Sequence, residues 1–132
     1  LDYRIPAEIL YPKYFHKRGV LAAAREGDAV NPERQSSAAQ FYIVWGTTYS
    51  TMALDKMQGR LDETTGGKVQ LTPEVRDAYR KYGGTPHLDG QYTVFGEVVK
   101  GLNVVRDIDY VETDDYDRPV WDVKITKAFV IK

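Results

Sequence analysis

Short apolar runs separated by polar turns predict three β-strands, at residues 19–24, 40–45 and 91–99. The clearest is QFYIVW at 40–45, in which aromatic and β-branched residues dominate. Alternate side chains of a strand lie on opposite faces, so Gln40, Tyr42 and Val44 share one face. An amide and a phenol among apolar groups suit a binding surface better than a sealed core.

Helical spacing replaces this alternation between residues 46 and 84. One helix is predicted over 50–61, where Met and Leu recur at helical intervals. A second is predicted to begin after Thr72 as N-cap with Pro73 in the first turn, and to stop at Gly83 and Gly84. A short third helix is predicted over 101–108.

The remaining segments are a long loop and a C-terminal strand. Residues 25–38 are polar and contain Gly27, Asn31 and Pro32, as in an ordered surface loop, and loops of this length are often functional. Residues 121–132 are predicted to form a last strand with a one-residue phase shift, which suggests a bulge. Strands joined by helices and long loops, without βαβ regularity, favour a barrel or an α+β arrangement.

Length and charge narrow the function classes. With 132 residues the chain has room for one domain, 1–132, and not for two. Its 18 basic and 19 acidic residues leave no electrostatic footprint for nucleic acid, and the apolar runs are too short to insert into a membrane. We therefore predict a soluble protein, cytoplasmic or periplasmic. The lack of cysteine excludes disulfides and thiolate chemistry.

Local motifs give no support for a metal or cofactor. DETTGGKV at 62–69 fails the phosphate-loop spacing at both ends, and ETDDYD at 112–117 lacks the central glycine of a calcium loop, which favours a solvated acidic loop. His16 and His87 lie far apart, so a zinc site would need two carboxylates brought in by the fold. We predict neither a metal nor a cofactor.

Two segments together resemble cyclophilin-type peptidyl-prolyl cis/trans isomerases. They are GVLAAAREGDAVNPERQSSAAQFYIVWG at 19–46 and GTPHLDGQYTVFGEVVKGLNVVRDI at 84–108, in the family's order. The resemblance implies a mainly β fold, an eight-stranded antiparallel barrel with flanking helices, here incomplete at the N-terminus. Residues 47–82 look like a helical insertion of the kind some bacterial members carry.

The resemblance also implies a groove for proline-containing polypeptides. Gln40 matches the groove glutamine, Tyr42 the aromatic floor of the proline pocket, Leu88 its apolar wall, and Tyr92 a position held by His or Tyr. From the residues alone, the favoured interpretation of Tyr42 and Leu88 is that they are ordinary core side chains. The glutamine beside Tyr42 favours the groove, because a buried amide would need every polar atom paired.

Other groove positions depart from the family pattern. Ala24, Arg25 and Glu26 match the Ala-Asn-Ala stretch whose backbone pairs with substrate, and Arg25 changes the side chain while keeping the backbone groups. His87 replaces the tryptophan associated with tight cyclosporin binding, which implies weak inhibition by that drug.

The family's catalytic arginine, in a segment resembling F-H-R-x-I-x-x-F, is absent. FHKR at 15–18 matches a different part of the pattern. We therefore predict an isomerase of X-Pro bonds that assists folding, with no catalytic residue in this chain and negligible activity alone. The alternative is a silent module that only binds proline peptides. A barrel lacking strands exposes edges, so we also expect association with the missing N-terminal segment or with a second copy.

Overall fold

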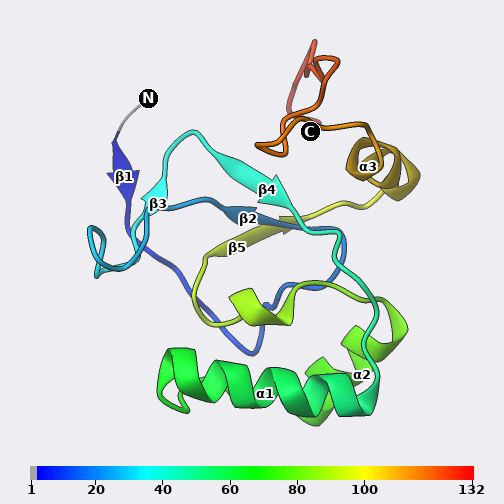
Figure 1. Ribbon diagram of the computed structural model, residues 1–132. Coiled ribbons are helices and arrows are strands. Elements are labelled where there is room, and N and C mark those ends of the chain that lie inside the picture. The colour runs from blue at the N-terminus through cyan, green and yellow to red at the C-terminus, as the bar shows by residue number, and fades with distance from the viewer. Residues whose placement is uncertain (1–2) are drawn as a thin grey trace.

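Two small antiparallel sheets and three α-helices form the chain in a computed structural model that describes residues 3–132 (Figure 1). The elements in chain order are β1 (Arg4–Ile5), β2 (Val20–Ala23), β3 (Ser36–Ser37), β4 (Phe41–Ile43), α1 (Thr51–Thr65), α2 (Pro73–Lys81), the 3₁₀ turn η1 (Pro86–Leu88), β5 (Val94–Glu97) and α3 (Leu102–Asp109). None of the helices within residues 3–132 is long and apolar enough to cross a membrane.

The main sheet has the strand order β4-β2-β5, with both pairs antiparallel. Leu21 of β2 pairs with Ile43 on one side and Gly96 on the other, and the β2–β5 register shifts between Leu21 and Ala22. The three predicted strands are thus confirmed, each shorter than its apolar run. A second sheet pairs β1 with β3. Within residues 3–132 no closed barrel forms, and the content is mixed α and β.

Both helices predicted between the strands are present, and their caps explain their limits. Ser50 accepts a hydrogen bond from the amide of Ala53 and begins α1, which runs past the predicted end at residue 61 to a left-handed cap at Gly66. Thr72 caps α2 by accepting from the amide of Val75. α1 continues past Gly59, because a glycine inside a helix lowers its stability by only about 1 kcal/mol and the burial of Leu61 offsets that loss.

The hydrophobic core lies with the helices. α1, α2 and the chain between them bury a cluster against which Tyr11 and Phe15 of the N-terminal segment pack. Its buried members are Leu54, Leu61, Val69, Leu71, Val75 and Tyr79. α1 and α2 lie together below the main sheet in Figure 1, with α3 beyond the end of β5. The helical half of the molecule therefore has a complete core of its own.

One face of the main sheet remains uncovered. Phe41 on β4 is 48% exposed and Phe95 on β5 is 59% exposed, whereas Val44, on the opposite face of its strand, is buried. Hollows of about 340 and 280 Å³ adjoin Phe41, one shared with Ala23 and Phe95 and the other with Ile108 of α3. The face of the 40–45 run that carries Phe41, Ile43 and Trp45 is thus more exposed than the opposite face.

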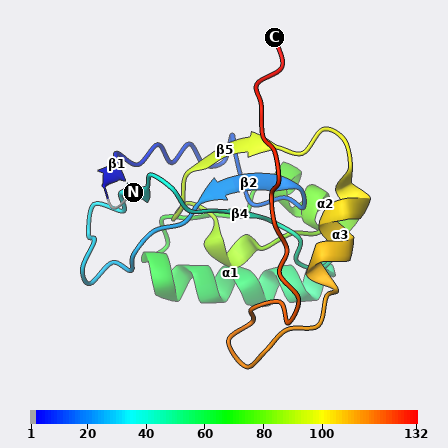
Figure 2. The same cartoon turned by 90° about the horizontal axis from the view of Figure 1, so that it is seen from above.

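The strand predicted over residues 121–132 is wrong. These residues form no strand, and Ile125, Phe129 and Val130 are exposed. Figure 1 shows the chain after α3, coloured orange to red, above the main sheet, and in the view of Figure 2 its last part passes in front of that sheet. A strand is stabilised by hydrogen bonds to a neighbouring strand, and neither sheet described within residues 3–132 includes this segment.

Gly84 should tolerate substitution poorly. It bridges to Lys17 and to Thr47, its φ is +150°, and a Cβ there would overlap the carbonyl oxygen of His16 and lie 2.8 Å from the Tyr79 ring. Gly84→Ala should therefore lower the free energy of unfolding by about 2–5 kcal/mol, measured by urea denaturation. The control is Gly27→Ala, which meets no atom within 4 Å. If the two variants were equally stable, the close packing around Gly84 would not limit which residue can stand there.

Candidate functional site

A buried chain of polar side chains links helix α2 to the main sheet. Tyr79 Oη of α2 donates a 2.6 Å hydrogen bond to Asp89 Oδ2, and the other carboxylate oxygen lies 3.1 Å from His16 Nδ1. His16 Nε2 lies 2.7 Å from Tyr42 Oη on β4. The backbone amide of His16 also donates to Asp89 Oδ1, at 2.8 Å. Four side chains distant in sequence thus form one continuous path.

Backbone hydrogen bonds around η1 hold Asp89 and His16 in position. Asp89 follows η1, whose turn closes with a hydrogen bond from the Asp89 amide to Pro86. His16 is fixed because its carbonyl accepts from the amide of Thr85. Asp89 is 0% exposed. A buried carboxylate without partners would cost several kcal/mol, so its three donors hold the surrounding segments together.

Aromatic rings surround the end of this path at Tyr42. The His16 and Tyr42 rings stack with centroids 5.9 Å apart, and Tyr92 stands edge-on to both, at 6.2 and 6.0 Å. The Arg25 guanidinium covers the Tyr92 ring, with Cζ 4.4 Å from its centroid. Edge-to-face aromatic pairs and cation–π contacts each stabilise by about 0.5–1.5 kcal/mol, so the cluster is firmly ordered.

The electrostatics keep the phenols neutral. Burial raises the pKa of Tyr42 above its usual range, and the nearby Tyr92 and Asp89 raise it further, although Arg25 opposes them. Burial and the Asp89 carboxylate likewise raise the pKa of Tyr79. Both hydroxyls therefore keep their protons at neutral pH and remain able to donate the hydrogen bonds of the path.

Three of the predicted site residues meet in this cluster, namely Tyr42, Tyr92 and Arg25. His87 and Leu88 are half-buried in η1, directly before Asp89. Tyr42 is half-buried, so it is neither a sealed core residue nor a fully exposed one. Its hydroxyl is committed to His16.

Gln40 lies beside a different hollow. It is exposed and borders the 340 Å³ hollow together with Ser36 and Phe41. The backbone of Ala24 is already occupied, because its amide donates to Gln40 and its carbonyl accepts from Ser37.

Arg25 presents a free backbone beside this site. Within residues 3–132, no hydrogen bond uses its backbone amide or carbonyl. The neighbouring Glu26 is exposed, but its carbonyl accepts from Arg25 Nη1 and from Asn31. Among the three backbone positions implied by the resemblance, Arg25 is thus the one whose amide and carbonyl both lack a hydrogen bond within residues 3–132.

Sequence reasoning missed the roles of His16, Asp89 and Tyr79. Asp89 belongs to the LDG motif and His16 to FHKR, but neither pattern shows which partners the fold supplies. Tyr79 occurs in a helix whose apolar spacing indicates only packing. The carboxylate of a short glycine-flanked motif is the one signal that could have pointed to a structural hydrogen-bond acceptor.

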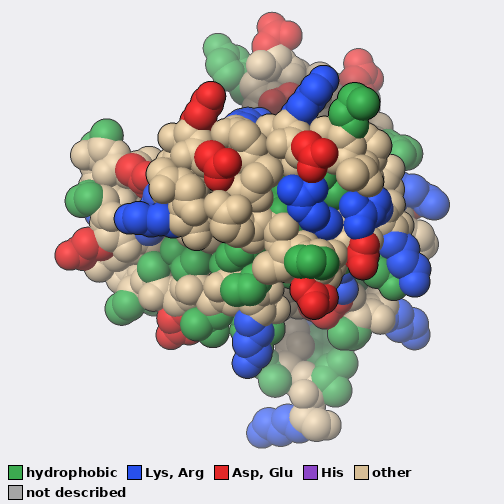
Figure 3. Space-filling view, turned by 90° about the horizontal axis from the view of Figure 1, so that it is seen from below, with side chains coloured by type: hydrophobic (Ala, Val, Ile, Leu, Met, Phe, Trp, Pro, Cys, Tyr) green, Lys and Arg blue, Asp and Glu red, His purple; other side chains and the backbone are tan. Residues whose placement is uncertain are grey.

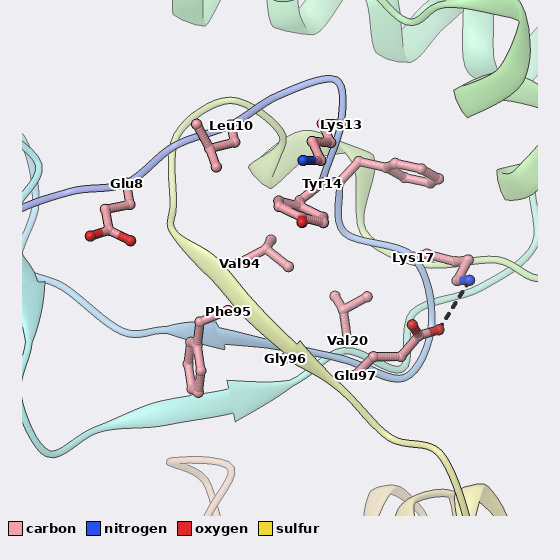
Figure 4. A pocket seen from close by; sticks show the side chains of 11 residues that line it. Glu8, Leu10, Lys13, Tyr14, Lys17, Val20, Val94, Phe95, Gly96 and Glu97 are labelled. Atoms are coloured by element: carbon pink, nitrogen blue, oxygen red, sulfur yellow. Dashed lines mark ion pairs between the residues drawn. The ribbon is translucent and has the colours of Figure 1, made fainter.

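A larger hollow, of about 600 Å³, lies elsewhere, between the N-terminal segment and β5. Figure 4 shows Leu10 and Tyr14 facing Val94 across it, with the Lys17–Glu97 ion pair of 3.2 Å at one end. None of the predicted site residues lines it. Among residues 3–132, no group of three His, Cys, Asp or Glu side chains is arranged to hold a metal ion.

Comparison with known proteins defines the class. The sequence profile described as "Cyclophilin type peptidyl-prolyl cis-trans isomerase/CLD" matches residues 2–130. The chain therefore belongs to the cyclophilin-type peptidyl-prolyl cis-trans isomerase family, as the motifs at 19–46 and 84–108 predicted.

Individual relatives agree with the family. A putative peptidyl-prolyl cis-trans isomerase of Staphylococcus aureus is 32% identical over 111 residues, 84% of this chain and 49% of that protein. Peptidyl-prolyl cis-trans isomerase-like 1 of Neurospora crassa is 52% identical over 48 residues, 36% of this chain and 29% of the relative. The chain thus spans about half or less of the relatives it matches.

His87 should make stability depend on pH. Burial, with a smaller contribution from Arg60, lowers the pKa of His87 below its ordinary 6.5. As the pH falls, His87 therefore takes up a proton in the unfolded chain before it does so in the folded chain. The free energy of unfolding is accordingly at its full value above about pH 6.5 and decreases as the pH falls toward the lowered pKa of His87 in the folded chain. We expect His87→Gln to flatten this part of a urea-denaturation pH profile. If the free energy of unfolding changed with pH in the same way for the variant and the original chain, His87 would not be the source of the pH dependence.

Proposed function

We propose that this chain supplies the peptide-binding part of a peptidyl-prolyl cis-trans isomerase acting on extended proline-containing polypeptides. The observation that carries the proposal is the half-buried Tyr42 ring, anchored by His16 and flanked by Tyr92 and Arg25. A flat aromatic surface held from behind suits a prolyl ring. Leu88 supplies apolar surface from the neighbouring turn, and the free backbone of Arg25 pairs with the extended peptide.

The reaction needs positioning rather than covalent chemistry. Rotation about an X-Pro bond faces a barrier of about 18–20 kcal/mol because amide resonance is lost, and reaching about 1000 per second requires lowering it by roughly 7 kcal/mol. Holding the proline ring and the flanking backbone fixes the two ends of the rotating bond. Stabilising the twisted amide additionally requires a charged donor, which the resemblance assigns to an arginine outside residues 1–132.

The same proposal accounts for the uncovered sheet face. In it, the three strands of the main sheet are part of an eight-stranded antiparallel barrel, and residues 47–82 are a helical insertion on its outside within one domain. The exposed Phe41 and Phe95, the two hollows beside them and the unpaired apolar tail support it. Further strands of the protein, or a second copy, would cover that face.

Binding and turnover should separate experimentally. We expect the 132-residue chain to bind a blocked peptide with one Ala-Pro bond, seen by NMR titration, and not its Pro-to-Ala analogue. Tyr42→Ala should weaken binding about tenfold or more, because it removes the stacking surface. The matched control is Tyr116→Ala, since Tyr116 is 91% exposed. Equal losses in both variants would remove Tyr42 from the pocket.

The enzyme and the silent module differ in turnover. A protease-coupled isomerisation assay should detect activity when the upstream arginine-bearing segment is joined to the chain, and negligible activity from residues 1–132 alone. Inactivity of the joined form, with peptide binding intact, would favour the silent module. Robust turnover by the 132-residue chain would show that the missing arginine is dispensable.

The uncovered face should drive association. Size-exclusion chromatography with light scattering should show oligomers of the 132-residue chain, because exposed strand edges and apolar surface promote pairing. Phe95→Glu should reduce the association by placing a charge on that face. Val30→Glu is the control, since Val30 is exposed on the 25–38 loop. A stable monomer of the original chain would contradict the barrel proposal.

A further inference from the structure

Tyr79 has a role that helix packing alone does not explain. Its ring lies edge-on to Phe15 and Tyr49, with centroids 5.4 and 6.2 Å away, as expected for a core residue. Its hydroxyl, however, donates a 2.6 Å hydrogen bond to Asp89, in the turn that precedes β5. Phenylalanine would serve the packing equally well, so the hydroxyl acts on Asp89.

The hydrogen-bond directions along the path follow from the chemistry of each group. A carboxylate only accepts, so His16 Nδ1, 3.1 Å from Asp89, carries the proton. In a neutral imidazole the other nitrogen is then an acceptor, and Tyr42 Oη, 2.7 Å away, donates to it. Asp89 therefore selects the tautomer of His16 that accepts a hydrogen bond from Tyr42.

Tyr79 determines how firmly Asp89 makes that selection. Oδ2 receives the Tyr79 hydroxyl, while Oδ1 receives both the amide and the ring of His16. Without the hydroxyl, Oδ2 would be a buried acceptor with no partner, and the carboxylate would gain by turning toward another donor. Such a rotation would loosen the hydrogen bond to the His16 ring and, through it, the anchoring of Tyr42.

We propose that Tyr79 of α2 is a positioning residue for Tyr42, acting through Asp89 and the tautomer of His16. The inference rests on the proposed function, in which Tyr42 forms the floor of the prolyl pocket. The helical segment 47–82 thereby sets the geometry of a peptide site that it does not itself line. Tyr82, the C-cap of the same helix, is 48% exposed, and within residues 3–132 no hydrogen bond joins its side chain to Asp89 or His16.

A double-mutant cycle tests the connection. Tyr79→Phe should weaken binding of the Ala-Pro peptide about two- to tenfold, the worth of one hydrogen bond. In a Tyr42→Phe background the path has already lost its last hydrogen bond, so the same substitution should change affinity less than about twofold. Tyr82→Phe should have no effect in either background. Equal losses in both backgrounds, or wild-type affinity of Tyr79→Phe, would overturn the proposal.

A second measurement needs no peptide. The ¹⁵N resonances of the His16 ring should show one tautomer, with the proton on Nδ1, in the original chain and in Tyr82→Phe, and a mixture in Tyr79→Phe. A proton on Nε2 in the original chain would overturn the proposal even if Tyr79→Phe failed to fold. If no proline-specific binding occurs but the tautomer responds as expected, the proposed function fails while the linkage from Tyr79 to His16 stands.

Discussion

The carboxylate of Asp89 is the constraint on which the rest of the site depends. It has no exposed surface, and its hydrogen bonds come from His16, which precedes the main sheet, and from Tyr79 on α2. An ion in such a place is stable only when its donors are correctly placed, so small displacements of either segment are costly. The position of the Tyr42 hydroxyl is therefore held, through His16, by a carboxylate that does not itself contact Tyr42.

This arrangement divides the molecule into a closed half and an open half. The helices enclose Leu54, Leu61 and Val75, and the face seen in Figure 3 carries both acidic and basic side chains, with Lys and Arg more frequent toward its right side. The opposite face of the main sheet presents Phe41 and Phe95 to solvent. Burial of apolar surface contributes about 25 cal/mol per Å² to stability. Covering Phe41 and Phe95 with further protein surface would therefore stabilise the fold.

Local signals accounted for the elements that depend on local chemistry. Thr72 and Pro73 marked the start of α2 because capping involves only neighbouring residues. The prediction of a final strand over 121–132 was wrong because a strand forms only beside a partner strand. The alternation of apolar residues in this segment does not show whether such a partner is present. Likewise, Tyr42 could be proposed from its motif, but its contact with His16 is made by folding together segments 26 residues apart.

The guanidinium of Arg25 is engaged on several sides by the groups around it. Its Nε donates to the carbonyl of Gln91, its Nη1 to Glu26 and Asp28, and its plane covers Tyr92. The ion pair with Asp28, which lowers the pKa of that exposed carboxyl, offsets much of its charge. A guanidinium bound in this way orders the edge of the cluster, whereas stabilising a twisted amide requires donors directed at the substrate. The guanidinium of Arg25 is thus engaged by its own neighbours, and its contacts order the cluster around Tyr92.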